Sequence, residues 1–340
     1  MKRYTTAKLI LFSVALALGG CSSVPDSSAM AASPAPVPGP ALVLSAQPDH
    51  LVFSGTRDGT GAGASAVQTV TLRNNSEAPA VVSGVGFGGS PEAFALVSPP
   101  AFPQTLAPGK SLSLSVRLLP GSAVGVLRTT LNVLDNAVAV GAVPLSGLRA
   151  LGLEGDQEPT LAQIADALDY RVNVGSSNLL LGTGAGLIGD EVAAPLFERV
   201  SAAPVVLRPV ARYSPDGPSA YGFFVPEDGA ARTQVLGTMT VGGHQTLNPP
   251  LQAGSQGSFD PGSAAFGIYL AASSYAQQDT LTLDRLNTGP TRHAVRVYPL
   301  RDRAGQVIPG SYLLAFEPSA NGDYQDAVFV LENVRPVAAK

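Results

Sequence analysis

Ser111–Leu118, which reads SLSLSVRL, is the stretch that decides the fold. Its apolar and polar residues alternate with period two, so the three leucines and Val116 share one face of an extended strand. Leu127–Val133 repeats the pattern with its polar residues pointing away. Pro-Gly pairs at 108–109 and 120–121 supply turns on either side of the first run. These features predict half-buried antiparallel strands.

The region 42–150 contains further short runs of the same kind. They lie near Val70 and Leu72, at Ala80–Val82 and at Phe94–Val97, and the first of them ends in Asn74-Asn75-Ser76. Several short strands at roughly 8–12-residue spacing, separated by turn residues, are typical of a β-sandwich. We therefore expect residues 42–150 to form one β-sandwich domain.

Four segments of this region give a resemblance to a known class of domain. They are Leu51-Val52-Phe53, the strand end TLRNNS at 71–76, LAPGKSLSLSVRLLP at 106–120 and the closing VPLSG at 143–147. Together they resemble the abnormal-spindle/hydin (ASH) type of immunoglobulin-like domain, which occurs in bacterial secreted proteins as the choice-of-anchor D domain. The resemblance implies an Ig-like fold and carries no catalytic residues.

A second module is expected over residues 151–340. Leu161, Ile164, Ala165 and Leu168 have i, i+3, i+4, i+7 spacing, which predicts one helical face. Pro159 fits the first turn of that helix, where a missing N–H has no cost. Strand-like runs follow at 171–174, 203–210, 222–225, 233–241, 266–270, 294–298, 312–316 and 327–331. The predicted fold class is therefore all-β, with two β-sandwich domains in tandem and short helices in the second.

This module resembles an uncharacterised domain of bacterial secreted and surface proteins. The resemblance is carried by GDQEPT at 155–160, HAVRVYPL at 293–300, AFE at 315–317 and GDYQD at 322–326. The last stretch is similar to a wider extracellular motif. Because that family has no agreed activity, the resemblance implies an extracellular β module and nothing more specific.

The N-terminus has the pattern of a bacterial lipoprotein signal. Basic residues at 2, 3 and 8 precede the apolar run 9–18, and Leu18-Gly19-Gly20-Cys21 closes it. The pattern resembles a lipobox, which implies removal of residues 1–20 and diacylation of Cys21. Residues 21–41 are rich in Ser, Ala and Pro and predict a flexible tether. Ser22 after the cysteine favours the outer membrane by the sorting rule of diderm bacteria.

Composition excludes several kinds of function. Cys21 is the single cysteine, so a lipidated chain has no thiol left for a disulfide, a cysteine–zinc site or a cysteine nucleophile. The net charge of −4 becomes more negative when the basic signal is removed, which argues against a nucleic-acid partner. The 37 glycines and 29 prolines favour turns and short strands over long helices.

The strongest candidate site is an acidic loop between two apolar strands near the C-terminus. Glu317, Asn321, Asp323 and Asp326 fall within ten residues. Ca²⁺ takes six to eight oxygens from carboxylates, amides and carbonyls, and this loop offers about half of them. The alternative is that these residues cap turns, because Asn and Asp bond their own backbone and the EF-hand spacing is absent. Asp284 and Asn287 would belong to the same site if their strand pairs near this loop. Glu158 either belongs to the site or favours the start of the following helix.

The sequence contains few motifs that would indicate catalysis. Gly184–Gly189 matches G-x-G-x-x-G, yet Pro195 follows where a dinucleotide fold needs a helix, so a glycine-rich loop is the preferred interpretation. His50, His244 and His293 lack zinc-site spacing, and no G-x-S-x-G elbow occurs. A Ser–His–Asp triad whose members are distant in sequence and meet only in the folded chain stays an open alternative. From the sequence we predict no cofactor other than Ca²⁺, and no enzyme.

The sequence as a whole favours a lipid-anchored binding or scaffold protein of the cell envelope. Its membrane contact is the lipid on Cys21, and its partner is an envelope protein or a glycan. The alternatives are a carbohydrate-binding module and a hydrolase of an envelope polymer. A sugar site needs exposed aromatic rings, whereas alternation places most of the available rings in the core: Tyr213, Tyr221, Phe223, Phe224, Tyr269 and Tyr275.

Overall fold

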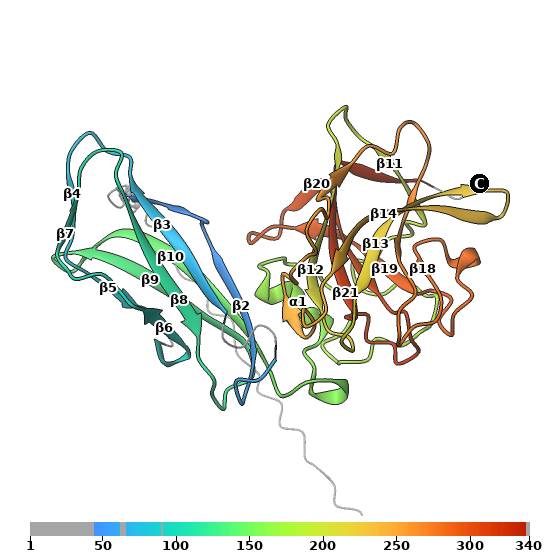
Figure 1. Ribbon diagram of the computed structural model, residues 1–340, viewed down its shortest axis with the longest axis horizontal. Helices are drawn as coiled ribbons and strands as arrows, with labels where there is room; N and C mark the ends of the chain where they lie inside the picture. The colour runs from blue at the N-terminus through green and yellow to red at the C-terminus, as the bar shows by residue number, and fades with distance from the viewer. Residues whose placement is uncertain (1–43, 62–65, 90, 338–340) are drawn as a thin grey trace, which may run out of the picture. The chain divides into compact units, whose positions relative to one another are not determined.

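Antiparallel β-sheets make up most of the computed structural model, which describes residues 44–61, 66–89 and 91–337 (Figure 1). The predicted all-β class with tandem β-sandwiches is confirmed. The signal at 1–20, Cys21 and the tether at 21–41 lie outside the described residues. The described residues all belong to one compact unit, and the expected boundary at residue 150 stays a prediction.

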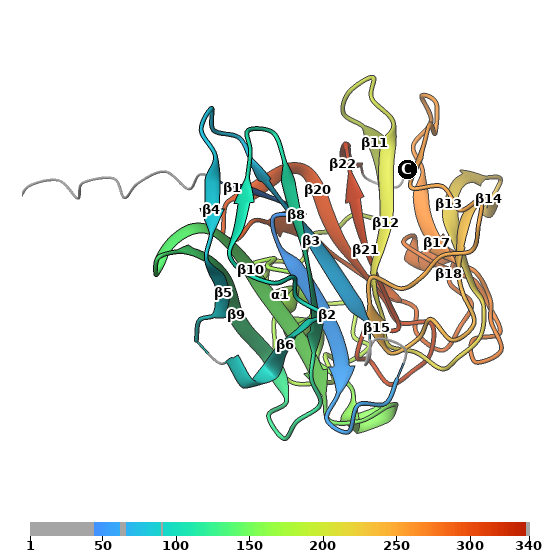
Figure 2. The same cartoon turned by 60° about the vertical axis from the view of Figure 1, so that its left-hand side comes forward.

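The first sandwich has two four-stranded sheets, ordered β1-β3-β8-β6 and β2-β10-β9-β5, with a short β4-β7 ribbon beside them. β10 pairs in parallel with β2, and the other pairs are antiparallel. Both cartoon views show β3 and β8 side by side (Figure 2). The elements are β1 (Leu44–Gln47), β2 (Leu51–Thr56), β3 (Val67–Asn74), β4 (Ala80–Val82), β5 (Gly84–Phe87), η1 (Pro91–Ala93), β6 (Phe94–Val97), β7 (Gln104–Leu106), β8 (Ser111–Leu118), β9 (Gly125–Asp135) and β10 (Val138–Ala150).

Strand β8 has the bounds of the stretch SLSLSVRL. Leu114 and Val116 are 1% and 0% exposed, while Ser111, Ser113 and Arg117 face solvent. Burying a leucine or valine side chain contributes about 1.5–3 kcal/mol, so the apolar face fixes which side of the strand meets the core.

The second sandwich packs the sheet β15-β12-β21-β20-β19, with β16 also paired to β12, against the sheet β14-β13-β17-β18. A separate ribbon joins β11 to β22. The elements are η2 (Gly155–Gln157), α1 (Leu161–Ala167), β11 (Leu196–Arg199), β12 (Val205–Arg212), β13 (Ser219–Glu227), β14 (Ala230–Met239), β15 (Thr246–Leu247), β16 (Ser258–Phe259), β17 (Gly267–Leu270), β18 (Thr280–Leu281), η3 (Asp284–Leu286), β19 (Val295–Arg301), β20 (Val307–Phe316), β21 (Ala327–Glu332) and β22 (Val334–Val337).

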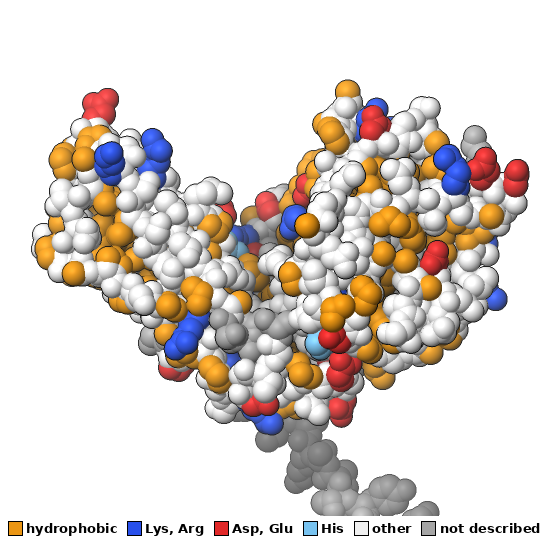
Figure 3. Space-filling view, viewed as in Figure 1, with side chains coloured by type: hydrophobic (Ala, Val, Ile, Leu, Met, Phe, Trp, Pro, Cys, Tyr) orange, Lys and Arg blue, Asp and Glu red, His pale blue; other side chains and the backbone are white. Residues whose placement is uncertain are grey.

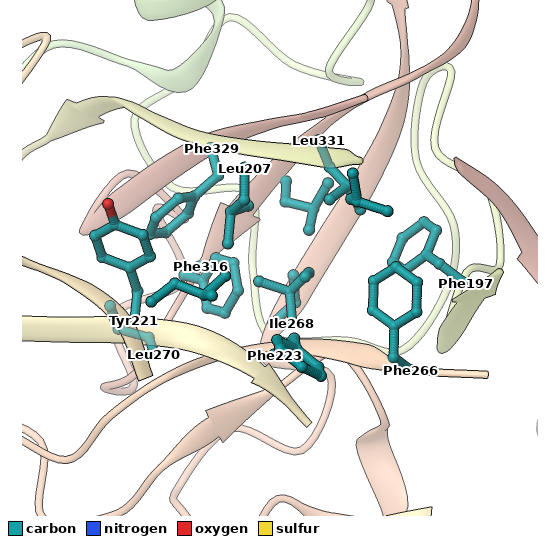
Figure 4. Packing of buried hydrophobic residues seen from close by; sticks show 14 of the residues in the cluster. Phe197, Leu207, Tyr221, Phe223, Phe266, Ile268, Leu270, Phe316, Phe329 and Leu331 are labelled. Carbon is teal, nitrogen blue, oxygen red and sulfur yellow. The ribbon is translucent and has the colours of Figure 1, made fainter. Parts of the chain in front are cut away.

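Aromatic rings fill the core of this second sandwich (Figure 4). Phe223 stacks on Phe259 with ring centroids 4.5 Å apart, and Phe266 meets both rings edge-on. Phe329 lies between Tyr221 and Phe316, at 5.2 Å and 5.3 Å. Such pairs add stability beyond the area they bury, and they explain why these strands are rich in Phe and Tyr.

The predicted helix forms as α1 and begins with a capping box. The Thr160 hydroxyl accepts from the N–H of Gln163, and the Gln163 side chain accepts from the N–H of Thr160. Pro159 therefore lies before the N-cap, so its expected place in the first turn is wrong. The helix packs against β9 and β10. No helix among the described residues is long and apolar enough to cross a bilayer.

One predicted strand, at residues 171–174, is wrong. The segment has no strand pairing along its length, although Arg171 donates one backbone bond to Arg301. The backbone of Asn173 is instead bonded to Asp190. Its N–H donates to the Asp190 carboxylate, and its carbonyl accepts from the Asp190 N–H. The other seven predicted runs of this module fall on β12, β13, β14, β17, β19, β20 and β21.

Candidate functional site

The structure brings the four predicted residues of the acidic loop together between β20 and β21. Glu317, Asp323 and Asp326 are 0%, 2% and 6% exposed, and each offers a carboxylate oxygen within 4.8 Å of the others. The loop is folded by its own polar groups. Both oxygens of Glu317 accept: one from the N–H and hydroxyl of Ser319, the other from the N–H groups of Gly322 and Asp323. Glu317 is thus the residue that shapes the loop.

Asp326 is the member of the cluster whose bonding is incomplete. Its Oδ2 is buried and has no hydrogen-bond partner in the described part of the chain. Buried polar atoms are nearly always paired, so an unpaired carboxylate oxygen needs an explanation. Asp323 is better satisfied, because the amide of Asn321 donates to its Oδ2 at 2.6 Å.

These side chains open onto a cavity of about 220 Å³, which we call the acidic cavity. Its lining includes two acids from outside the predicted loop, Glu154 and Glu158, which flank η2. The sequence left the role of Glu158 open, and the structure places it in the cavity. The sequence feature that pointed to Glu158 was the acidic run before the predicted helix. Two glutamines that no sequence motif marked hold Glu158 there, since Gln245 and Gln325 both donate to its carboxylate.

Burial raises the pKa values of three carboxyls at the cavity, those of Glu158, Asp323 and Asp326. Glu158 has a pKa of about 7, because burial disfavours its charged form and Asp323 and Glu154 add repulsion. Burial and the neighbouring Glu317 raise the pKa of Asp323 to about 6. Burial, with Glu317 and Asp323 beside it, raises the pKa of Asp326 well above its ordinary value.

No cation of the protein matches this negative charge directly. In the described part of the chain, no Lys or Arg lies within salt-bridge distance of Glu158, Glu317, Asp323 or Asp326. Arg212 is fully buried nearby, but it donates to Ser214 and to the carbonyls of Pro215 and Thr240. Burial lowers the pKa of Arg212, while Asp326 and Glu154 act against that shift.

Asp284 and Asn287 do not join the acidic cavity. Asp284 accepts from His293 at 2.8 Å, and Asn287 bonds the backbone of Leu281 and Arg292. His293 also contacts Glu191 at 2.8 Å through its other nitrogen. These two carboxylates raise the pKa of His293 to about 9, with its partial burial acting against them.

The G-x-G-x-x-G segment surrounds an arginine side chain. The carbonyls of Gly182, Gly184 and Gly186 accept from the guanidinium of Arg296, which also pairs with Glu191. Arg296 is 1% exposed and lies 4.6 Å from the centroid of the Tyr324 ring. The glycine loop is therefore a structural feature, as preferred from the sequence, with a buried arginine at its centre.

The described histidines have different surroundings. His244 lies 3.3 Å from Asp216 at the surface. His50 lies between Ser146 and Asp169, a constellation that the sequence did not specify, because its members are 96 and 23 residues apart along the chain. Of the six rings considered for sugar binding, five are buried as alternation predicted, namely Tyr213, Tyr221, Phe223, Phe224 and Tyr269, and Tyr275 is half-buried.

Fold and site together define a β-sandwich protein with a buried acidic cavity. No protein-family model matches the chain, and no curated protein is detectably similar. Solved structures show distant likeness to the CupB2 chaperone of Pseudomonas aeruginosa, at 12% identity over 70% of this chain and 97% of the other, with a TM-score of 0.26.

Two further structures show likeness of the same order. The secreted serine protease VesC of Vibrio cholerae is 10% identical over 86% of this chain and 51% of its own length, with a TM-score of 0.23. The YadV chaperone is 8% identical over 68% of this chain and 94% of its own length, also with a TM-score of 0.23. Scores of this size support no inference about activity.

Proposed function

We propose that this chain is a lipid-anchored binding or scaffold protein of the cell envelope, and that its C-terminal module holds a divalent cation, Ca²⁺, in the acidic cavity. The observation that carries the cation site is the unpaired, buried carboxylate oxygen of Asp326 beside Glu317 and Asp323. Burying several carboxylates costs free energy unless a counter-charge is present, and the described residues supply none within contact distance.

The donor set suits a hard cation. Asp323 and Asp326 offer carboxylate oxygens, and the amide of Asn321, turned about its last bond, offers a second kind of oxygen. Glu317 already accepts four hydrogen bonds and acts mainly by holding the loop. Water completes the coordination, because Ca²⁺ commonly retains some of its solvent ligands.

The same spacing disfavours glycoside cleavage at this place. Glycosidase carboxyl pairs are separated by about 5–10 Å, which leaves room for a sugar and a water. Glu317, Asp323 and Asp326 each place one carboxylate oxygen within 4.8 Å of the others, which is the spacing of ligands around one ion. The cation is therefore preferred over the hydrolase as the role of this cavity.

The envelope setting rests on the sequence. Cys21 would carry the lipid, residues 21–41 would be the tether, and the modules would present loops and edges to a protein or glycan partner. The resemblance of residues 42–150 to the ASH/choice-of-anchor D domains and of 151–340 to an uncharacterised extracellular domain supports that setting. On the face drawn in Figure 3, charged side chains are scattered, with no basic stripe.

Calorimetric titration of the metal-free protein with Ca²⁺ tests the cation site. We expect binding heat and a rise in melting temperature in the wild type, and neither in Asp326→Asn, which keeps the size of the side chain and removes its charge. Asp228→Asn is the matched control, since Asp228 is an exposed turn residue. A wild-type protein that shows no heat and no thermal shift would overturn the site.

The anchoring proposal has its own experiment. Cys21→Ser should release a folded protein from the membrane fraction, and tight membrane association of that variant would contradict lipidation. A pull-down from envelope extract with the released form then identifies the class of partner. One stoichiometric protein would support a scaffold, and glycan alone would support a carbohydrate-binding module.

A further inference from the structure

Outside the acidic cavity, a serine, a histidine and an aspartate form a chain of consecutive hydrogen-bonding contacts. The Nε2 of His50 lies 3.0 Å from the hydroxyl of Ser146, and its Nδ1 lies 3.2 Å from the Oδ2 of Asp169. His50 immediately precedes β2, Ser146 is on β10, and Asp169 follows α1, which packs against β10. This is the order of contacts that activates a serine for nucleophilic attack.

The partners assign the protons of the imidazole. The carboxylate of Asp169 only accepts, so the Nδ1 of His50 carries the hydrogen. In the neutral ring Nε2 is then an acceptor, and the Ser146 hydroxyl donates to it. Burial lowers the pKa of His50, which keeps the ring neutral and able to take a proton. The tautomer is the one that a general base for Ser146 needs.

Asp169 is held in place by two arginines. Arg128 on β9 contacts its Oδ1 at 3.2 Å, and Arg303 contacts its Oδ2 at 2.8 Å. The side chain of Asp169 is 11% exposed and that of His50 is 8% exposed. The carboxylate is therefore oriented by fixed charges, and the histidine is largely shielded from water.

Ser146 is 1% exposed and belongs to the lining of a hollow of about 500 Å³ that is open to solvent. We call it the polar hollow; its walls include Gly88, Arg128, Thr130, Asn132, Leu145 and Arg303. Arg303 is 46% exposed and contacts Asp169 through its Nε, and the described part of the chain supplies no hydrogen bond to its two terminal amino groups. An open, mixed-polarity hollow beside a free guanidinium edge fits an acyl ester presented by a larger anionic molecule.

We propose that Ser146, His50 and Asp169 form an acyl-transfer site that hydrolyses carboxylic esters carried by a polar, anionic molecule. The Ser146 oxygen attacks the ester carbonyl carbon while Nε2 of His50 takes the hydroxyl proton. The tetrahedral adduct expels the alcohol, which receives that proton from His50, and the acyl group stays on Ser146. Water then attacks the acyl-serine with His50 again as base, and the products are one carboxylic acid and one alcohol.

This activity goes beyond the proposed binding role and needs no cation. Its catalytic residues would be Ser146 and His50, while Asp169 orients the ring and stabilises the imidazolium that forms. The two sites can fail separately, because neither shares a side chain with the other.

A fluorophosphonate probe, which modifies activated serines covalently, tests the proposal on the full chain at pH 8. We expect one probe per chain on Ser146, located by mass spectrometry of the peptides. Ser146→Ala should abolish labelling. His50→Gln should slow it by at least about a hundredfold, the usual contribution of a positioned general base. Ser54→Ala is the matched control, since Ser54 is a buried serine of the same sheet whose hydroxyl contacts Thr246.

A second variant separates activation from folding. Asp169→Asn preserves shape but presents the wrong partner to Nδ1, so it should slow labelling strongly while the circular dichroism spectrum is kept. The acetyl ester p-nitrophenyl acetate then serves as substrate, and turnover should be lost in Ser146→Ala. Absence of label on Ser146, or labelling that is unchanged in His50→Gln and Asp169→Asn, would overturn the proposal.

Discussion

The acidic cavity and the Ser146–His50–Asp169 constellation differ in how their charge is balanced. In the acidic cavity several buried carboxylates meet no cationic side chain, and one oxygen of Asp326 has no partner. In the constellation the carboxylate of Asp169 is matched by two arginines and a histidine. A cluster of carboxylates without a cationic partner needs a cation from solution. A carboxylate whose charge is already balanced can instead position its neighbours for proton transfer.

A third network, around Arg296, is matched in charge. Glu191 and three glycine carbonyls accept from its guanidinium, and His293 pairs with Glu191, while the Nε of Arg296 has no hydrogen-bond partner among the described residues. The comparison therefore separates three outcomes for buried charge, namely ion binding, proton transfer and stability.

The largest effect is expected at Arg296. Arg296→Gln leaves Glu191 buried with an incomplete set of partners and frees the carbonyls of the glycine loop, so it should destabilise the fold by about 3–5 kcal/mol. Denaturant unfolding measures this loss. Arg335→Gln is the control, because the Arg335 pair with Glu198 is largely exposed and should contribute under about 1 kcal/mol. Equal losses in the two variants would contradict a structural role for Arg296.

The second effect is the pH dependence of the metal-free protein. Unfolded Glu and Asp release their protons near pH 4, whereas folded Glu158 and Asp323 hold theirs until about 7 and about 6. The stability that these protonated groups contribute is complete below about pH 4 and is lost as the pH rises through 6 and 7. We expect a loss on the order of 2 kcal/mol between pH 5 and 8, discounted for partial exposure to solvent.

Thermal unfolding at both pH values, with and without Ca²⁺, checks this prediction. Bound cation should reduce the loss, because it stabilises the ionised carboxylates. Asp326→Asn should reduce it as well, in the absence of Ca²⁺. A metal-free protein that becomes more stable between pH 5 and 8 would contradict the description of the cavity as charge without a partner.

The sequence predicted the strands better than the sites, for a physical reason. Alternation in β8 reports one face of one strand, so it needs no knowledge of the rest of the molecule. The loop cluster at 317–326 was also visible, because its members are close in sequence. Glu158 and Gln245 reach the same cavity from distant segments, and His50, Ser146 and Asp169 meet only after β2, β10 and α1 have packed. The segment at 171–174, wrongly predicted as a strand, has a strand-like composition, yet the side chain of Asp190 supplies the partner of its backbone.

A smaller effect is expected at the start of α1. Thr160→Ala removes one half of the capping box and should cost about 1 kcal/mol in stability. Because α1 leads directly to Asp169, the same change should also slow labelling of Ser146, whereas Thr160→Ser should restore both. Unfolding and probe kinetics on the two variants measure this. Slower labelling that persists in Thr160→Ser would separate the cap from the site.

The smallest effect is expected in the pH profile of Ser146 labelling. Burial lowers the pKa of His50 below 6.5, with the Asp169 charge opposing the shift and Arg303 and Arg128 assisting it. More than half of the base is then neutral at pH 6.5, so the labelling rate should change by less than about twofold between pH 6.5 and 8.5 and should fall further at lower pH. An imidazole of ordinary pKa would instead give a rate that rises across pH 6.5. A serine ionising without His50 would give a rate that climbs throughout, so the shape of this profile identifies which group takes the proton.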